Sequence, residues 1–403
     1  MNVTILPRPL AGTVAAIPSK SQAHRLLICA ALAGEPTDLR CAALSRDILA
    51  TADCLRALGT GIDRTPEGFS MIPGPKPREA EADCGESGST LRFLLPVAGA
   101  LGVDTTFRLH GRLPQRPLSP LWEEMERMGC RLSRPTGDTV RCQGALGPGT
   151  YTLAGNVSSQ FISGLLFALP ALPGDSEIRL TGSVQSKPYL DMTVGALRSF
   201  GIVISERDWG YEIPGNQRFH SPGTLCVEGD WSNGAFWLTA KALGSHITVT
   251  GLDPRSPQGD RAVEALLPQI LDRGGDIDVS QIPDLVPTLA VAAARGGGVT
   301  RFVGAGRLRI KESDRIASVS ALLRALGGRT EEGAERLTVY PTGLRGGTVS
   351  AENDHRIAMA AAVASTICRE PVTLLGAEAV EKSYPAFWQD FRALGGEARE
   401  ETP

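Results

Sequence analysis

Six short polar or charged segments in this chain of 403 residues each run directly into an apolar stretch, a pattern typical of the start of a buried helix. The segments begin at or next to residues 21, 88, 158, 232, 284 and 354, so the intervals are 67, 70, 74, 52 and 70 residues. Spacing this regular indicates a tandem repeat of low identity. We therefore predict six copies of one structural unit.

Each interval also contains a second, amphipathic helical pattern that ends on a glycine. In one of them, Leu118, Leu121, Trp122, Met125 and Met128 lie on one helical face. The closing glycines are Gly59, Gly129, Gly201, Gly274, Gly327 and Gly395. Short β-branched segments follow them, such as 202–204 and 337–340, and these are typical of strands. Each unit is thus expected to run β-α-β-α-β.

The length of the chain favours two domains, because one hydrophobic core seldom serves 403 residues. Six units divide into three plus three, and the Pro- and Gly-rich stretch 214–223 precedes the shortened interval. We place one domain at residues 19–227 and the other at residues 1–18 plus 228–403. The strand expected at 3–6 then completes the second domain.

Composition argues against several classes of partner. Lys and Arg number 41 against 44 acids, for a net charge of -3, which gives no reason to expect nucleic acid or a membrane surface. The longest apolar runs, such as 161–170 and 357–364, are too short to span a bilayer. Pro7 and Pro9 interrupt the N-terminal segment, which therefore does not resemble the apolar core of a signal peptide. We expect a cytoplasmic protein. The eight cysteines form no metal-ligand spacing, so buried thiols and no metal are expected.

Cations accompany the predicted helix starts, where the helix dipole favours anions. Ordinary N-capping explains Ser158, Asp230, Ser232 or Asp354 taken singly. Capping does not require the following cations: Lys20, Arg25, Arg92, Arg116, Lys311, Arg315, Arg356 and Lys382. Lys20 and Ser21, with Arg25 one turn further on, would suit a phosphate.

Residues 311–315, Lys-Glu-Ser-Asp-Arg, are expected at the head of a surface helix. Lys311 and Arg315 would share a face while Glu312 points elsewhere. The alternative is a solvated first turn in which Asp314 interacts with Arg315. Arg356 begins a strongly apolar helix, where an anion or acid must meet it.

Other motifs bear on the type of ligand. The hydroxyls and amide of 158–160 suit a polyhydroxylated ligand. No phosphate-binding loop of the Gly-x-x-x-x-Gly-Lys type is present, and 304–306 lacks the third glycine of a dinucleotide fingerprint. Nucleotide binding is therefore disfavoured.

Nine segments together resemble the 5-enolpyruvylshikimate-3-phosphate synthase family, in the order that family has them. The segments are 18–25, 85–92, 112–117, 158–161, 186–191, 282–284, 309–315, 353–356 and 382–385. The resemblance implies an α/β (α+β) protein with the two-domain enolpyruvyl transferase fold. Each domain would contain three β-α-β-α-β-β repeats, and the active site would lie in the interdomain cleft.

The same resemblance implies an enzyme that transfers the carboxyvinyl group of phosphoenolpyruvate to the 5-hydroxyl of shikimate 3-phosphate. Phosphate is released through a tetrahedral intermediate, without metal or cofactor, in the pathway to chorismate and aromatic amino acids. The first domain would mainly bind shikimate 3-phosphate, and the second would mainly bind phosphoenolpyruvate and carry the catalytic acids. The expected partners are these two small molecules, and the expected state is a monomer.

Site residues are carried over from the family position by position. Shikimate 3-phosphate is expected to contact Lys20, Ser21, Arg25, Ser158, Ser159, Gln160, Ser186, Tyr189, Asp284 and Lys311. Phosphoenolpyruvate is expected to contact Lys20, Gly88, Ser89, Arg116, Gln160, Arg315, Arg356 and Lys382. Asp284, Glu312 and Lys20 resemble the catalytic groups. Asp284 is suited to deprotonating the hydroxyl, and Glu312 and Lys20 are candidates for the carbon proton, with the order of steps left open.

Four positions depart from the family pattern: Glu86 and Arg307, where many members have asparagine, and the pair Ala23-His24, where Ser-Asn is common. Two alternative functions share features of this pattern. The sister enzyme that acts on UDP-N-acetylglucosamine carries a loop cysteine, whereas residues 111–117 contain none. A non-catalytic anion-binding module could lose its acids, whereas Asp284 and Glu312 are both present.

Overall fold

The computed structural model describes residues 1–401. By its internal contacts the chain divides into two compact units, each with its own hydrophobic core. The first unit contains residues 20–227, and the second contains residues 1–19 and those from 228 onward. No helix within residues 1–401 is long and apolar enough to cross a membrane.

One repeat of the first unit contains every element of the predicted repeat. Its sheet has the order β10-β11-β13-β12, in which β10 and β11 are parallel and the other pairs are antiparallel. Along the chain its elements are β10 (Thr150–Ala154), α5 (Ser159–Ala168), η2 (Leu169–Ala171), β11 (Ser176–Thr181), α6 (Lys187–Ser199), β12 (Ser205–Arg207) and β13 (Gly210–Ile213). This is the predicted β-α-β-α-β-β repeat.

The other two repeats of the first unit follow the same order. One has β6 (Glu79–Asp83), α3 (Gly88–Leu101), β7 (Asp104–Arg108), η1 (Leu113–Gln115), α4 (Leu121–Arg127), β8 (Arg131–Ser133) and β9 (Thr139–Gln143). The other has α1 (Lys20–Leu32), β3 (Thr37–Arg40), α2 (Arg46–Ala57), β4 (Gly61–Thr65), β5 (Gly68–Ile72) and β14 (Thr224–Cys226). The chain enters this unit at α1, so β14, which is parallel to β3, supplies the missing first strand.

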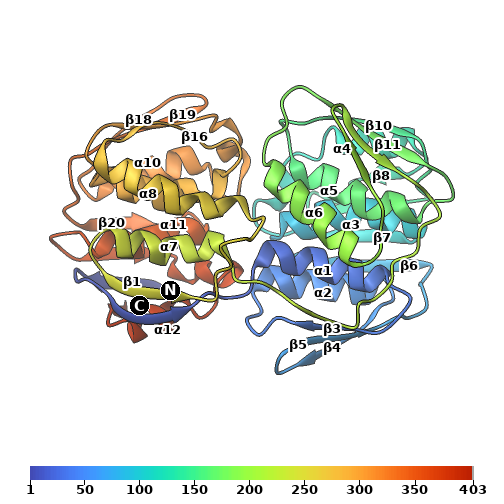
Figure 1. The fold of residues 1–403 in the computed structure, drawn as a ribbon, viewed down its shortest axis with the longest axis horizontal. Helices are drawn as coiled ribbons and strands as arrows, with labels where there is room; N and C mark the ends of the chain where they lie inside the picture. Colours follow the sequence, from blue (N-terminus) through green and yellow to red (C-terminus); the bar gives the residue numbers. More distant parts are fainter. Residues whose placement is uncertain (402–403) are drawn as a thin grey trace. The chain divides into compact units, whose positions relative to one another are not determined.

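Two repeats of the second unit build four-stranded sheets. One has β16 (Gly275–Asp278), η4 (Pro283–Leu285), α9 (Val286–Ala294), β17 (Thr300–Val303), η5 (Gly306–Ile310), α10 (Arg315–Ala325), β18 (Arg329–Glu332) and β19 (Arg336–Tyr340). The other has β20 (Gly347–Ser350), α11 (His355–Ser365), β21 (Val372–Leu375), η6 (Ala377–Lys382), α12 (Phe387–Ala393) and β22 (Glu397–Glu401). The N-terminal strand β1 (Asn2–Leu6) lies between β21 and β22, pairs with both, and completes the sheet that also contains β20 (Figure 1).

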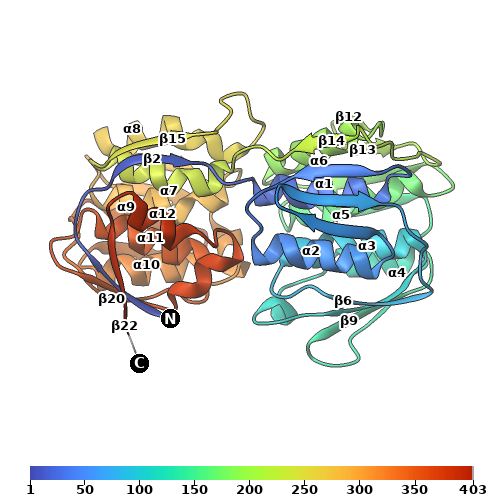
Figure 2. The same ribbon diagram turned by 90° about the horizontal axis from the view of Figure 1, so that it is seen from below.

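The third repeat of the second unit is shorter, in agreement with the short interval in the sequence. Its strands β2 (Ala11–Ala15) and β15 (His246–Thr250) are parallel and lie side by side (Figure 2). Its helices are α7 (Trp231–Ala242), η3 (Gly259–Ala262) and α8 (Val263–Asp272). The predicted α/β fold class is therefore confirmed. Five of the six units show the predicted β-α-β-α-β-β order, whereas this unit forms a two-stranded sheet within the described residues, so the prediction of a full repeat was wrong here.

The predicted glycine stops are confirmed in every repeat. All six closing glycines have positive φ, between 67° and 109°, a backbone region that favours glycine over other residues. The helix starts also agree, because Ser158, Asp230 and Asp354 are N-caps whose side chains accept backbone N–H groups.

The expected surface helix at residue 311 was wrong in its start and in its exposure. Helix α10 begins at Arg315, where the side chain of Asp314 accepts the N–H of Ala317. Lys311 lies before the helix, and Arg315 is fully buried. Asp314 forms an ion pair with Arg309, and Arg315 pairs with other acids, so the alternative of a solvated first turn in which Asp314 interacts with Arg315 was also wrong.

Smaller differences concern strand and helix ends. The strand expected at 202–204 begins at Ser205, and α4 begins at Leu121. The expectation of buried thiols is confirmed for seven cysteines, whereas Cys226 on β14 is exposed.

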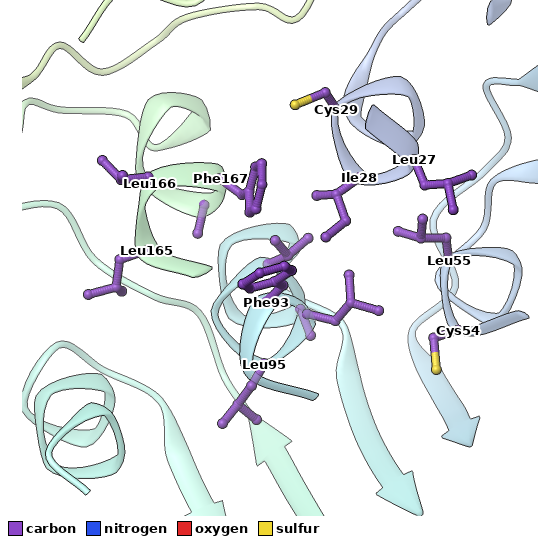
Figure 3. Packing of buried hydrophobic residues seen from close by; sticks show 14 of the residues in the cluster. Leu27, Ile28, Cys29, Cys54, Leu55, Phe93, Leu95, Leu165, Leu166 and Phe167 are labelled. Carbon is purple, nitrogen blue, oxygen red and sulfur yellow. The ribbon is translucent and has the colours of Figure 1, made fainter. Parts of the chain in front are cut away.

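Helix-to-helix packing forms the core of the first unit and fixes where its helices begin. Helix α1 contacts α2 and α6, α3 contacts α2 and α5, and α5 contacts α6, so these five helices close a ring. Figure 3 shows Phe93 of α3 next to Ile28 of α1 and Phe167 of α5, and the centroids of the Phe93 and Phe167 rings, which meet edge to face, are 5.5 Å apart. Because α3 and α5 are apolar almost all round, they are buried and their first turns are held in place.

Candidate active site

The first turns of α3 and α5 meet in the first unit through the side chain of Gln160. Its Nε2 donates to Ser89 Oγ at 2.8 Å, and its Oε1 accepts from Arg92 Nη1 at 2.8 Å. Arg92 also donates to the carbonyl of Pro117 at 3.1 Å and lies over the Phe161 ring. Arg92 therefore fixes which way the Gln160 amide faces.

Gly88 leaves space for two arginines at the start of α3. A Cβ on Gly88 would lie 2.7 Å from Arg116 Nη1 and 2.8 Å from Arg92 Nη1, closer than real Cβ contacts. The absence of a side chain thus allows both guanidinium groups to approach the helix N-terminus, where the dipole and the free N–H groups favour an anion. The predicted residues Gly88, Ser89, Arg116 and Gln160 are brought together here.

Arg25 is a buried cation whose partners are neutral. Its Nε donates to Thr193 Oγ1 at 2.8 Å, and its Nη groups donate to the carbonyls of Ser21 at 2.6 Å and Tyr189 at 2.8 Å. Within residues 1–401 no carboxylate lies at ion-pair distance from it. Burial lowers the pKa of Arg25 to about 10. A charge held this way is suited to an anionic ligand.

The remaining predicted residues of the first unit also lie at helix starts. Lys20, the first residue of α1, pairs with Asp47 of α2 at 3.0 Å. Ser158 caps α5, with its Oγ accepting from Gln160 N, and Ser159 is buried in the first turn. Ser186 precedes α6 with φ of 57°, a conformation uncommon for a residue with a side chain.

Arg315 binds three carboxylates in the second unit. Its Nη1 donates to Asp284 at 2.7 Å, its Nη2 to Glu312 at 2.7 Å and its Nε to Asp354 at 2.8 Å. The expectation that Glu312 points elsewhere was therefore wrong. Burial would lower the pKa of Arg315, but the three acids outweigh it and raise the pKa above its ordinary value. The guanidinium holds the acids in fixed positions.

Asp284 connects Arg315 with two further cations. Arg356 Nη2 donates to its Oδ2 at 3.0 Å, and Lys311 Nζ lies 3.6 Å from its Oδ1. Burial lowers the pKa of Lys311 to about 8; Asp284 opposes this effect, whereas the nearby charge of Arg307 adds to it. A lysine with such a pKa changes charge close to neutral pH.

Lys382 is positioned by the turn before α11. Its Nζ donates to the carbonyl of Asn353 at 2.6 Å, and its side chain is almost fully buried. Asn353 directly precedes Asp354, whose Oδ1 accepts the N–H of Arg356 at 2.9 Å. The predicted second-unit residues Asp284, Lys311, Glu312, Arg315, Arg356 and Lys382 thus belong to one network.

Sequence reasoning missed four members of these networks. Asp354 was interpreted only as a cap, although it is also an acid partner of Arg315. Arg92 was noted as a cation but not placed in the site, and Asp47 was not noticed. Asp260 accepts from Ser232, and burial together with the charge of Asp284 raises its pKa to about 6. A charged residue at an otherwise apolar helix start was the signal that could have found Arg92.

No group of three or more His, Cys, Asp or Glu residues is placed to hold a metal ion anywhere in the described chain. The acids of the second unit are instead joined to cations. The buried cations of each unit therefore suit anionic ligands.

Comparison with known proteins agrees with this chemistry. The model of the EPSP synthase (3-phosphoshikimate 1-carboxyvinyltransferase) family matches residues 6–391. The chain belongs to this family. The predicted family is thereby confirmed.

Curated relatives extend the EPSP synthase match over nearly the whole chain. The 3-phosphoshikimate 1-carboxyvinyltransferase of Clostridium kluyveri is 40% identical over 419 residues, with 99% of this chain and 98% of the relative covered. That of Clostridium botulinum, strain Eklund 17B, is 40% identical over 425 residues, with 98% of each covered.

Two solved structures share the fold. EPSP synthase from Acinetobacter baumannii superposes with a TM-score of 0.81 at 24% identity, covering 99% of this chain and 100% of that one. The enolpyruvyl transferase NikO from Streptomyces tendae gives a TM-score of 0.75 at 19% identity, covering 100% and 99%. The enolpyruvyl transferase fold of the EPSP synthases is therefore the fold of this chain.

Proposed function

We propose that this protein is a 3-phosphoshikimate 1-carboxyvinyltransferase. It transfers the carboxyvinyl group of phosphoenolpyruvate to the 5-hydroxyl of shikimate 3-phosphate and releases phosphate, in the shikimate pathway. The observation that carries the proposal is the binding of Asp284, Glu312 and Asp354 to one buried arginine within a chain that matches this family over residues 6–391.

Residues of the first unit mainly bind the acceptor in this proposal. The buried cation Arg25, with Ser21 and Lys20 at the start of α1, suits the 3-phosphate. The acceptor is a hydroxylated cyclohexene, which hydrogen-bond donors and an aromatic ring can bind. The donors are Ser158, Ser159 and Gln160 at the start of α5 and Ser186 at the start of α6, and the ring is that of Tyr189. Lys311 and Asp284 of the second unit hold the reacting side of the acceptor.

Phosphoenolpyruvate carries a carboxylate and a phosphate, so several cations must meet it. One set of phosphoenolpyruvate-binding residues comes from the first unit: Arg116, Lys20, Gly88, Ser89 and Gln160. The closeness of Arg116 to Gly88 supports this assignment. The second set is Arg315, Arg356 and Lys382. Ligand binding would require the Arg315 and Arg356 guanidinium groups to divide their hydrogen bonds between Asp284 and the ligand.

The reaction proceeds by addition and then elimination. Asp284 takes the proton of the 5-hydroxyl, whose oxygen forms a bond to C2 of phosphoenolpyruvate while C3 gains a proton. Loss of one C3 proton then restores the C2–C3 double bond, and the bond from C2 to the phosphate oxygen breaks to release phosphate, while the new ether bond to the acceptor is kept. Glu312 and Lys20 are the candidates that deliver and remove the C3 proton.

The proposed activity is tested by phosphate release. Purified protein is incubated with phosphoenolpyruvate together with shikimate 3-phosphate or UDP-N-acetylglucosamine, and with phosphoenolpyruvate alone. Release only with shikimate 3-phosphate supports the proposal. Release only with the UDP-sugar would assign the sister reaction, and no release with either would favour the non-catalytic anion-binding module.

Three finer statements belong to the same proposal. The protein acts on these small molecules without nucleic acid or membrane, as a monomer, and in the cytoplasm. Sedimentation of the purified protein at catalytic concentrations tests the monomer, and a dimer mass would overturn it.

A further inference from the structure

A chain of buried side-chain hydrogen bonds runs across three helices of the first unit. His24 Nδ1 lies 2.7 Å from Thr51 Oγ1, Thr51 Oγ1 lies 2.6 Å from Thr90 Oγ1, and Thr90 Oγ1 donates to Ser87 Oγ at 2.7 Å. All four side chains are almost inaccessible to solvent. This series of hydrogen bonds starts on α1, crosses α2 and ends at the N-cap of α3.

The direction of these hydrogen bonds follows from the last one. Thr90 gives its only hydroxyl proton to Ser87, so in the contact with Thr51 it must accept. Thr51 therefore donates to Thr90 and accepts from His24. This requires a proton on Nδ1 of His24 and fixes the tautomer of the ring.

The charge state of His24 agrees with one defined tautomer. Burial, followed by the nearby charges of Lys20 and Arg25, lowers the pKa of His24 well below its usual value. The ring is thus neutral, with the proton on Nδ1. Its Nε2 is buried and has no hydrogen-bond partner in the described chain.

Both ends of this series of hydrogen bonds lie near proposed substrate residues. Lys20 and His24 are four residues apart on α1, and their partners Asp47 and Thr51 are four apart on α2, so the two contacts form successive rungs between these helices. At the other end, Ser87 and Thr90 bracket Gly88 and Ser89 in the first turn of α3.

We propose that His24 is a positioning residue for phosphoenolpyruvate, which through Thr51 and Thr90 sets the first turn of α3 relative to Lys20. This proposal rests on the proposed function. Apolar side chains could pack the three helices together without the cost of burying polar atoms. A connected series of buried hydrogen bonds, by contrast, is satisfied in only one arrangement of the helices, so it fixes their relative positions. An Asn at position 24 could supply the same donor through Nδ2.

Steady-state kinetics of three variants test the proposal. Thr51→Val keeps the shape but breaks the chain, and Thr239→Val is the matched control because Thr239 is a buried hydroxyl on α7 without a partner. We expect Thr51→Val to raise the KM for phosphoenolpyruvate about tenfold. The KM for shikimate 3-phosphate should change less than about twofold. His24→Asn should keep near-normal values, and Thr239→Val should change neither KM.

A folded Thr51→Val protein with both KM values unchanged would overturn the proposal, as would equal changes in Thr239→Val. An independent readout is the nitrogen NMR spectrum of the wild-type imidazoles, with His24 assigned by its loss in His24→Asn. We expect a proton on Nδ1 and none on Nε2, and the opposite tautomer would overturn the proposal. Because this spectrum needs no turnover, it separates failure of this inference from an inactive wild type, which would refute the proposed function instead.

Discussion

Arg315 donates from Nη1 to Oδ1 of Asp284 at 2.7 Å, although Asp284 is the acid expected to accept the substrate proton. Arg356 occupies the other oxygen of the same carboxylate at 3.0 Å. The carboxylate is thus held in one orientation, and any base chemistry it performs depends on these two cations.

Asp284→Asn should lower kcat by about 10²–10⁴-fold, the usual contribution of a positioned acid or base. The amide retains an oxygen for Arg315 but cannot take a proton. Turnover and thermal unfolding are measured on the same preparation. A normal kcat in a folded variant would remove Asp284 from the catalytic residues.

Glu312→Gln should reduce turnover far more than it reduces binding. Glu312 accepts from Arg315 Nη2 at 2.7 Å, and glutamine can still accept through its amide oxygen. We expect kcat to fall at least about 100-fold with ligand affinities within a few-fold of normal, because only proton transfer is removed. Affinities are measured by calorimetry. Unchanged turnover would exclude Glu312 from proton transfer.

Arg315→Lys should destabilise the second unit. Lysine keeps the charge but cannot join three carboxylates with a planar fork, so at least one buried acid loses its partner. Breaking a buried charge pair costs about 3–5 kcal/mol. Urea unfolding measures the change, and Arg324→Lys, which alters a half-exposed arginine on the same helix, is the control. Equal stabilities of the two variants would contradict this prediction.

The acceptor KM should rise with pH between about 7 and 9. Lys311 has a pKa lowered to about 8, chiefly by burial, so it loses its charge in this window and attracts an anionic acceptor less. Lys311→Arg stays charged and should flatten the profile. The folded protein releases this proton at lower pH than the unfolded chain does. Burial of the charged Lys311 amine therefore costs stability below about pH 8, and this cost is removed as the pH rises to the ordinary lysine pKa near 10.4. A flat wild-type KM profile would be evidence against the assignment.

Gly88→Ala should impair phosphoenolpyruvate binding while leaving the acceptor largely unaffected. The added methyl group would lie 2.7 Å from Arg116 Nη1, so the guanidinium has to move. We expect a several-fold higher KM for phosphoenolpyruvate and an unchanged KM for shikimate 3-phosphate. Gly102→Ala probes a glycine with open space but positive φ, and it should affect stability rather than either KM.

Sequence periodicity predicted the repeats well because helix starts and glycine stops are local signals. Gly59 and Gly327, for example, have the positive φ that a closing glycine requires. The buried charges were harder to predict. Glu312 and Arg315 look like a solvated first turn in sequence, since only tertiary packing brings Asp284 and Asp354, 31 and 39 residues away, onto the same guanidinium.

Residues of the site that act through other residues left a still weaker signal. Thr51 and Thr90 are ordinary buried threonines by type, and their role depends on three helices meeting. Asp260 is separated in sequence from every other acid of its network, and nothing local marks it as buried. Long-range contacts of this kind cannot be read from periodicity.

Phosphorus NMR of one reaction mixture tests the central claim most directly. Protein is mixed with equimolar phosphoenolpyruvate and shikimate 3-phosphate, and the signals are followed to equilibrium. We predict that inorganic phosphate grows as phosphoenolpyruvate falls, in equal amounts, while the 3-phosphate is retained in a new product that carries a vinyl ether. Spectra that stay unchanged, or phosphate that comes from shikimate 3-phosphate, would contradict the account.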